Sequence, residues 1–298
     1  MRKSLSLMLE SDSGISVVAT ARNGQEGVEL ANKLRPDVIT LDIEMPIMDG
    51  LTALKKIMAE CPTSVIMVSS LTTEGAQATL KALELGAVDF IPKEMSFVSV
   101  NITKIKEDLI AKVKEIARTK LLKARIDRIK SISEKPAVRP RVTSYLSDIP
   151  KIGYRAVALG ISTGGPFTLQ KVLPLLSEQI KIPIFIVQHM PPKFTKSLAD
   201  RLNSLCKVQV KEAEDGEDVK GGMIYIAPGG FHMKLKKNGL NSFINITQEP
   251  SDTLHRPSVD VMMSSVIDVY GKYTLGVIMT GMGKDGYEAV KKLKSLSG

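Results

Sequence analysis

The sequence predicts an α/β fold built as two doubly wound parallel-sheet domains. Short apolar segments of strand length alternate with segments whose apolar residues recur at helical spacing, and this alternation is typical of parallel sheets covered by helices. The chain has 298 residues, which is room for about two domains of ordinary size. With 43% apolar and 24% charged residues, it also carries enough apolar material for buried cores.

The composition excludes several classes of protein. The longest apolar runs, such as residues 182–187, are far shorter than the roughly 18 residues needed to cross a bilayer. The first ten residues have a brief, serine-interrupted apolar stretch, unlike a signal peptide. Cys61 and Cys206 lie in different predicted domains, so a disulfide framework is not expected. We therefore expect a cytoplasmic protein with no direct membrane insertion.

A basic segment separates the two predicted domains. From Arg118 to Arg155 the chain has eleven Lys or Arg residues and three Asp or Glu residues, among prolines and serines. This composition is typical of a solvated linker, and the alternative is a surface for an acidic partner or a nucleic acid. We place the first domain at residues 1–118, the linker at 119–148 and the second domain at 149–298.

The elements of the first domain follow from apolar spacing and turn residues. Helices are predicted at residues 1–10, 25–34, 51–58 and 73–85, and from 99 toward 118 with an extension to 130. Strands are predicted at residues 15–21, 38–43, 64–70 and 86–93.

The second domain repeats the alternation and adds one hairpin. Strands are predicted at residues 156–162, 182–189, 208–213 and 222–227 and from residue 273, with a hairpin over 232–246 that turns at Asn238 and Gly239. Helices are predicted at residues 167–176, 195–205 and 258–270, and after Gly286. Ser258 is the expected N-cap of its helix.

Three polar side chains stand at the carboxyl ends of strands in the first domain: Asp42, Ser69 and Lys93. These strand ends meet at one edge of a parallel sheet, where ligands bind. A carboxylate there can accept a phosphoryl group, whose charge Lys93 would match and whose oxygens Ser69 would hydrogen-bond. Each residue taken alone is equally an ordinary polar loop residue.

With Leu41-Asp-Ile-Glu-Met-Pro-Ile-Met-Asp-Gly50, this region resembles the receiver domain of two-component response regulators. The resemblance implies a flavodoxin-like fold with Asp42 as phospho-acceptor, Ser69 as switch hydroxyl and Lys93 as phosphate contact. Receivers open with a central strand ending in an acidic pair that binds Mg²⁺. This chain begins at the following helix, so Asp42 is the only remaining carboxylate ligand. We expect an incomplete magnesium site here, and a parent protein that starts upstream and uses Mg²⁺ for phosphorylation.

In the second domain, Gly160-x-Ser162-x-Gly164 joins an apolar run to a helical pattern. This spacing fits the nucleophile elbow, a sharp turn that presents a serine hydroxyl at a strand end. A phosphate-cradling turn or a structural turn is the alternative, because glycine and serine are common in both.

His189 and Asp285 each follow a strand of the same domain, so the parallel sheet would bring them to the edge that carries Ser162. An imidazole can take the proton of a serine, and a carboxylate can orient and stabilise that imidazole. A structural role for His189 and a cap on the last helix for Asp285 are the alternatives.

The remaining histidines are less informative. His255, in Leu254-His-Arg-Pro-Ser-Val-Asp260, is an alternative base or a substrate contact, and His232 is expected at the surface beside the hairpin. The three histidines show no metal-ligand spacing, and a lone Gly-Met-Gly at 281–283 is not a dinucleotide fingerprint. The backbone N–H groups of that loop are instead candidates to stabilise an oxyanion.

Five motifs occur in order: Gly-Ile-Ser162-Thr-Gly-Gly-Pro, Val-Gln-His189-Met-Pro, Ala-Pro-Gly-Gly-Phe-His, His-Arg-Pro-Ser-Val-Asp and Thr-Gly-Met-Gly-Lys-Asp285-Gly. Together they resemble the Rossmann-like catalytic domain of the chemotaxis response-regulator methylesterases, a family that also has a receiver in front. By this resemblance Ser162 is the nucleophile, His189 the base and Asp285 the orienting acid. The backbone N–H of Met282 would stabilise the oxyanion, and Thr163 and the segment 254–260, which contains His255, would flank the substrate.

The resemblance implies hydrolysis of glutamyl methyl esters on chemotaxis receptors, with deamidation of receptor glutamines in many members. It implies no cofactor or metal in catalysis, a chemotaxis histidine kinase as phosphodonor, and a receiver that covers or props the cleft until Asp42 is phosphorylated. Family members continue beyond residue 298, so a C-terminal strand and helix are expected to be missing. The rivals are a non-enzymatic regulator that binds an acidic or nucleic-acid partner through the linker, and a small-ester serine hydrolase.

Overall fold

A parallel sheet in the order β1-β2-β3 forms the centre of the first domain in the computed structural model, which describes residues 1–93, 106–118, 153–239, 241–281 and 283–297. The strands are β1 (Val38–Asp42), β2 (Ser64–Ser69) and β3 (Asp89–Pro92). The helices are α1 (Arg2–Glu10), α2 (Gly24–Leu34), α3 (Gly50–Glu60), α4 (Thr73–Glu84) and a helix over 106–118. The middle strand β2 is almost wholly buried, as its unbroken apolar run predicts for a sheet covered on both faces.

Side-chain caps define where three of these helices begin. Asn23, Asp49 and Thr72 each accept a hydrogen bond from a backbone N–H in the first turn of α2, α3 and α4, respectively. Such a cap satisfies an N–H that has no partner within the helix and is worth about 1 kcal/mol. The helices therefore start close to the positions that the sequence pattern predicts.

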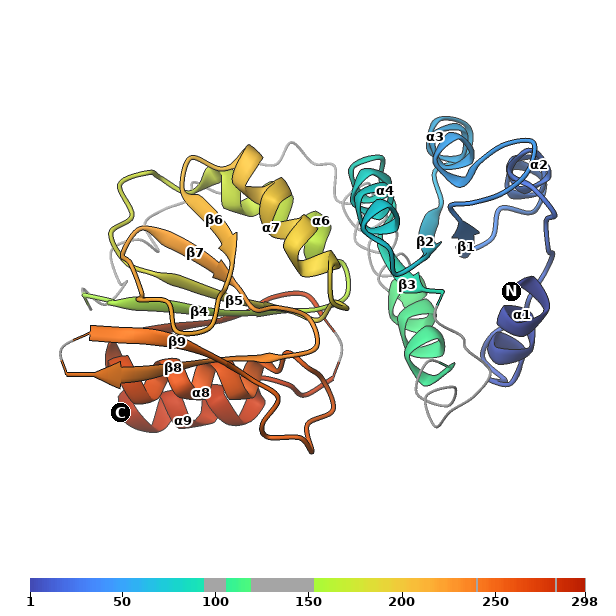
Figure 1. Cartoon of the computed structure of the whole chain (residues 1–298). Helices are drawn as coiled ribbons and strands as arrows, with labels where there is room; N and C mark the ends of the chain where they lie inside the picture. Colours follow the sequence, from blue (N-terminus) through green and yellow to red (C-terminus); the bar gives the residue numbers. More distant parts are fainter. Residues whose placement is uncertain (94–105, 119–152, 240, 282, 298) are drawn as a thin grey trace, which may run out of the picture.

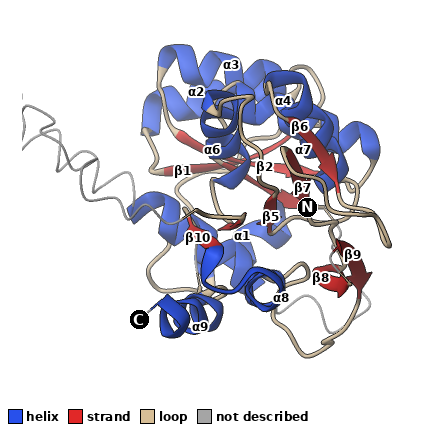
Figure 2. Cartoon of the chain, turned by 90° about the vertical axis from the view of Figure 1, so that its left-hand side faces the viewer, coloured by secondary structure: helices blue, strands red, loops and turns tan. Residues whose placement is uncertain are grey.

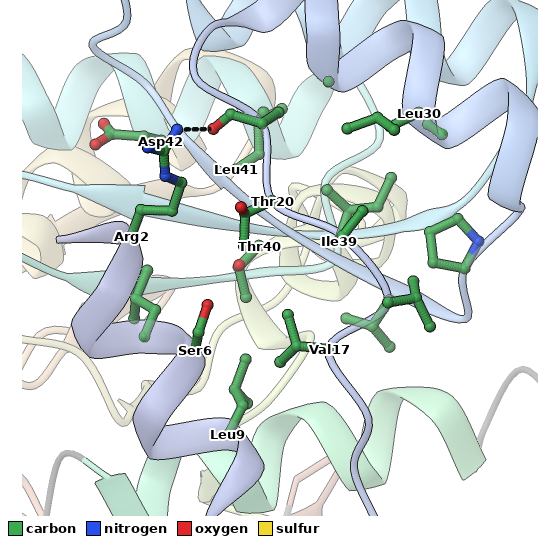
Figure 3. A pocket seen from close by; sticks show the side chains of 18 of the residues that line it. Arg2, Ser6, Leu9, Val17, Thr20, Leu30, Ile39, Thr40, Leu41 and Asp42 are labelled. Atoms are coloured by element: carbon green, nitrogen blue, oxygen red, sulfur yellow. Dashed lines mark hydrogen bonds between the residues drawn. The ribbon is translucent and has the colours of Figure 1, made fainter.

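The predicted strand at residues 15–21 is wrong, since the structure has no strand there. A strand needs a neighbour for its backbone N–H and C=O groups, and among the described residues β1 pairs with β2 alone. A cavity of about 800 Å³ is lined by both this segment and β1. Figure 3 shows Leu9 of α1, Val17 and Thr20 of the segment and Ile39 of β1 around that cavity. The segment has strand-like residues but no strand beside it.

The second domain has a five-stranded parallel sheet in the order β10-β4-β5-β7-β6. The strands are β4 (Ala156–Ile161), β5 (Ile184–Gln188), β6 (Gln209–Glu212), β7 (Met223–Ile226) and β10 (Thr274–Ile278). The helices are α6 (Gly165–Val172), α7 (Phe194–Leu205), α8 (Val259–Tyr270) and α9 (Tyr287–Ser297), with 3₁₀ turns at Leu173–Leu175 and Gly271–Tyr273. Figure 1 shows α6 and α7 on one face of the sheet and α8 and α9 on the other. The predicted doubly wound α/β class is confirmed for both domains.

The predicted hairpin is present as β8 (His232–Asn238) and β9 (Asn241–Thr247), which pair antiparallel in a separate sheet. It packs against α8, as the side view in Figure 2 also shows. The buried residues of β8, including Met233 and Leu235, join the apolar core beneath that helix. The hairpin therefore packs with α8 in one apolar layer on that face of the sheet.

The two domains meet through α4 and β3 of the first domain and α6 and α7 of the second (Figure 1). Phe90 of β3 stacks on Phe194 of α7 with ring centroids 4.6 Å apart, and Glu84 pairs with Arg201. Stacked, buried aromatic rings contribute both apolar area and a preferred geometry. The first domain therefore contacts α6 and α7, the helices that follow Ser162 and His189 in the chain.

Several predictions fall outside the described residues: the linker at 119–148, the parts of the long helix at 99–105 and 119–130, and Met282. Among the helices that are described, none is both long enough and apolar enough to cross a membrane.

Candidate active site

Neighbouring strands bring the three predicted side chains together. Ser162 follows β4 directly, His189 follows β5 directly, and Asp285 lies in the loop between β10 and α9. Because β10, β4 and β5 are adjacent and parallel, their carboxyl ends share one edge of the sheet. The backbone ties this edge further, since the N–H of Ser162 donates to the carbonyl of Thr280 in the loop after β10 (2.9 Å).

The three side chains form a continuous hydrogen-bonded array. His189 Nδ1 lies 3.1 Å from Ser162 Oγ, and His189 Nε2 lies 2.8 Å from Asp285 Oδ2. An ionised carboxylate only accepts, so Nε2 carries the proton of the neutral ring and Nδ1 is left to accept from the serine hydroxyl. The imidazole and carboxylate side chains are only 12% and 13% exposed. The geometry is that of a nucleophile, a base and an orienting acid.

Asp285 is held by the beginning of α8 rather than by the last helix. Its Oδ1 accepts from Ser258 Oγ (2.8 Å) and from the N–H of Asp260 (2.9 Å), and its Oδ2 also accepts from the N–H of Val259 (2.7 Å). The start of a helix favours a negative charge, because its first N–H groups are free and its dipole is positive there. Burial alone would raise the pKa of Asp285, but the hydrogen bonds from His189 and from α8 outweigh it and hold that pKa far below its usual range. Asp285 is therefore present as a carboxylate that can orient the His189 ring and balance a positive charge on it.

Close backbone approach explains two glycines at this edge. A Cβ on Gly281 would lie 2.8 Å from the Cβ of Ser162, and one on Gly165 would overlap Oε1 of Gln188. Gln188 is buried, and its Nε2 donates to the carbonyl oxygens of Ser162 and His189 (3.1 and 3.3 Å). The close approach of Gly281 thus leaves room for the serine turn, and the amide that ties the two strands occupies the space beside Gly165.

His255 and Thr163, which were predicted to flank the substrate, make different kinds of contact. The ring of His255 stacks on the ring of His189, with centroids 4.2 Å apart and an angle of 20° between the planes. Thr163 is buried, and its carbonyl accepts from Thr280 Oγ1 (3.0 Å). His255 thus borders the imidazole of His189, whereas the substrate roles of His255 and Thr163 stay predictions.

In the first domain, Lys93 forms an ion pair with Asp42, but the hydroxyl of Ser69 bonds to a different group. Lys93 Nζ lies 2.8 Å from Asp42 Oδ1 and 2.7 Å from Glu44 Oε2. Burial alone would lower the pKa of Lys93, but its hydrogen bonds to these two carboxylates raise it. Ser69 is buried, and its hydroxyl donates to the carbonyl of Gly75 (3.0 Å). The carboxylate and the ammonium are paired, while the hydroxyl is bonded to α4.

A magnesium ion would require more oxygen ligands beside Asp42 than these residues supply. Mg²⁺ takes oxygen ligands in octahedral geometry, often with one or two carboxylates. Glu44, the neighbouring acidic side chain, pairs with Lys93, and no group of three His, Cys, Asp or Glu side chains in the described part of the chain could hold a metal ion. The described residues therefore do not fit a magnesium site by themselves.

The sequence did not predict two residues that support the Ser162–His189–Asp285 array, and it predicted the wrong position for a third residue nearby. Ser258 was expected as a helix cap within a substrate-flanking segment. It does accept from the N–H of Val261, but its hydroxyl also donates to the carboxylate of Asp285. Gln188 precedes His189 directly and had no separate signal. The expected surface position of His232 is wrong, because this side chain is fully buried beneath the loop before α8. Hairpin spacing alone does not reveal which loop covers a strand.

A receiver-type α/β domain in contact with an α/β domain that carries a Ser–His–Asp array defines a class, the response regulators with a hydrolase-type effector domain. Two family models match the chain in agreement with this class: "Response regulator receiver domain" over residues 1–102 and "CheB methylesterase" over residues 157–298.

Relatives extend this match over the whole chain. The sequence is 49% identical over 319 residues to protein-glutamate methylesterase/protein-glutamine glutaminase 1 of Oleidesulfovibrio alaskensis, covering 100% of this chain and 85% of that protein. It is 44% identical over 300 residues to the protein-glutamate methylesterase/protein-glutamine glutaminase of Pyrococcus abyssi, covering 100% and 79%. A crystal structure of the Thermotoga maritima CheB methylesterase catalytic domain is 46% identical, with a TM-score of 0.47, over 49% of this chain and 77% of that one. The chain belongs to the protein-glutamate methylesterase/protein-glutamine glutaminase family.

Proposed function

We propose that this protein hydrolyses γ-glutamyl methyl esters on chemotaxis receptors, with Ser162 as nucleophile, His189 as base and Asp285 as orienting acid. The observation that carries the proposal is the array in which His189 contacts the serine hydroxyl through Nδ1 and the carboxylate through Nε2. The names of the relatives support the substrate class, since they describe protein-glutamate methylesterases.

In the first half of the reaction, Ser162 Oγ attacks the ester carbonyl while its proton moves to His189 Nδ1. The imidazolium that forms is stabilised through Nε2–H by Asp285, whose negative charge α8 maintains. The carbonyl oxygen becomes an oxyanion, for which the N–H groups of the loop at 281–283 are the proposed donors. The tetrahedral species then expels methanol, which takes the proton from Nδ1, and an acyl-enzyme remains on Ser162.

In the second half, His189 Nδ1 takes a proton from water as that water attacks the acyl carbonyl. Collapse returns the proton to Ser162 Oγ and releases the glutamyl carboxylate. A glutamine side chain presents the same carbonyl with ammonia as leaving group, so the same residues are suited to deamidation. The second half of the relatives' names, protein-glutamine glutaminase, favours this additional activity.

The substrate is tested by measuring methanol release from a methylated chemotaxis receptor and, in parallel, turnover of a small chromogenic ester. We expect kcat/KM for the receptor to exceed that for the small ester by on the order of 10²-fold, because contacts remote from the ester contribute to transition-state stabilisation. The unmethylated receptor is the control for background methanol.

Two results would contradict the proposal. Equal or faster turnover of the small ester would favour a general serine hydrolase. Absence of methanol release, together with salt-sensitive binding of DNA or RNA, would favour a regulator that acts through the basic segment between residues 118 and 155.

We further propose that the receiver restrains the effector domain through α4 and α7 until Asp42 is phosphorylated. A phosphoryl group on Asp42 would change the hydrogen-bond partner of Lys93. Lys93 follows β3 directly, and Phe90 of the same strand stacks on Phe194 of α7. The lysine that would respond to the phosphoryl group is thus close in sequence to an aromatic residue that contacts the second domain.

Removing the ion pair between the domains is expected to raise the basal rate of methanol release. Arg201→Ala breaks the pair with Glu84, and a partly exposed pair is worth about 1 kcal/mol or less, so the rise should be about two- to fivefold. The measurement is a double-mutant cycle. Glu84→Ala should give a similar rise, and the double variant should give no more than either alone. A rate that stays unchanged or falls in both single variants would contradict the restraint.

A further inference from the structure

His232 is a buried titratable residue that the proposed reaction does not use. It is the first residue of β8, and none of its side chain is exposed. Its Nδ1 lies 3.2 Å from the backbone N of Ser258, and its Nε2 lies 3.1 Å from the carbonyl oxygen of Pro250 and 3.2 Å from Thr253 Oγ1. One imidazole therefore bonds both ends of the segment that joins β9 to α8.

The partners determine which ring nitrogen carries the proton. The backbone N–H of Ser258 only donates, so Nδ1 of His232 accepts; the carbonyl of Pro250 only accepts, so Nε2 donates. This is the neutral Nε2–H form. Burial lowers the pKa of His232 and so acts in the same direction, although the bond to Pro250 opposes it. Both ring nitrogens are satisfied only in that form.

The segment that His232 ties down carries two contacts to the catalytic array. His255, within the segment, stacks on His189. Ser258, at its end, donates its hydroxyl to Asp285 and opens the helix whose first N–H groups bind the same carboxylate. A continuous series of contacts thus runs from His232 through Ser258 and Asp285 to His189.

We propose that His232 is a positioning residue for the array: by accepting from Ser258 N–H and donating to Pro250, it fixes the loop that orients Asp285 and His189. The inference rests on the proposed esterase function. The hydrogen-bond partners of His232 are Pro250, Thr253 and Ser258, and the reaction proposed above moves no proton through its ring. Its effect is on the placement of the residues that do, and a displacement of about 1 Å in an active site can cost on the order of 10² in rate.

Three variants separate positioning from packing. His232→Leu removes both hydrogen bonds at similar volume, and we expect kcat to fall by on the order of 10²-fold with KM nearly unchanged. His232→Asn puts an amide oxygen where Nδ1 lies, so it keeps the bond from Ser258 N–H. Its kcat should be at least about tenfold higher than that of His232→Leu. Leu235→Ala, at a buried position of the same strand, is the control: it should lower the unfolding midpoint without lowering kcat.

A spectroscopic measurement without substrate keeps this inference distinct from the proposed function. The chain has only three histidines, so ¹⁵N-histidine labelling gives three rings that single variants can assign. We expect the Nε2–H form for His232 in the wild type, and a shifted or broadened His189 Nε2–H resonance in His232→Leu but not in His232→Asn. A wild type that releases no methanol but shows this pattern would contradict the esterase function and leave the positioning intact.

The positioning role would be overturned by any of three results. The first is an Nδ1–H form for His232. The second is a His232→Leu variant whose kcat and His189 resonance match the wild type. The third is a His232→Asn variant as slow as His232→Leu, because the lost rate would then reflect packing rather than the bond to Ser258.

Discussion

Ser162→Ala is expected to lower kcat/KM for methanol release from methylated receptor by on the order of 10⁴- to 10⁶-fold. The hydroxyl is the atom that forms the acyl-enzyme, so without it the covalent route is lost and hydrolysis would require direct attack of water on the ester. His189 Nδ1 would lose its only hydroxyl partner recorded in the described structure. The measurement is steady-state methanol release with enzyme in the micromolar range, so that a residual rate can be quantified.

Stability and a matched serine separate chemistry from folding in this experiment. Ser162 makes its structural bonds through its backbone N–H and carbonyl, which alanine retains, so the free energy of unfolding should change by less than about 1 kcal/mol. Ser204→Ala removes an exposed serine hydroxyl from α7 and should leave kcat/KM unchanged. Receptor demethylation by Ser162→Ala at a tenth or more of the wild-type rate would rule out this serine as the nucleophile.

Asp285→Asn is expected to lower kcat/KM by on the order of 10⁴-fold, because it reverses the tautomer of the base. An amide nitrogen facing His189 Nε2 donates where the carboxylate accepted, so the ring proton moves to Nδ1 and the ring can no longer take the proton of Ser162. If the amide is turned the other way, its nitrogen faces Ser258 and Asp260, which both donate. Neither orientation satisfies all the partners.

The same variant should also lower stability, by about 1–2 kcal/mol, since it removes a charge that α8 binds at its start. Because the fold lowers the pKa of Asp285, this contribution is complete above the unfolded pKa of about 3.9 and is lost as the pH falls toward the folded value. Asp268→Asn is the control. Asp268 lies on α8 and pairs with Lys292 of α9, so this change breaks an exposed pair and should cost under about 1 kcal/mol with no loss of rate. Equal activity of Asp285→Asn and wild type would remove Asp285 from the array.

Local signals were sufficient for most of the fold. The apolar run at 64–70 predicts a buried strand and β2 is one, and the N-cap expected at Ser258 is present. Residues 15–21 show the limit of such signals, because a strand requires hydrogen-bonding partners that its own sequence does not contain. Periodicity describes a segment's own preference, while pairing depends on what lies beside it.

The candidate site was predictable for a physical reason that applies to parallel sheets in general. A side chain directly after a strand is at the carboxyl edge, so the sequence positions of Ser162 and His189 already imply that they are neighbours once β4 and β5 pair. Asp285 stands seven residues beyond the end of β10, and its direction depends on how that loop folds back. No pattern in the sequence predicted that its carboxylate would bind the start of α8.

By itself, then, the sequence determined the α/β class, the order of the elements and the set of side chains that reach one edge of the sheet, because alternating apolar periods and turn residues are local properties. Only the tertiary structure decided that His189 faces Ser162 through Nδ1, that α8 holds Asp285, and that His232 lies buried beneath the loop that connects them. Those features depend on hydrogen-bond directions between segments far apart in the chain, and such directions exist only after the strands and helices have packed.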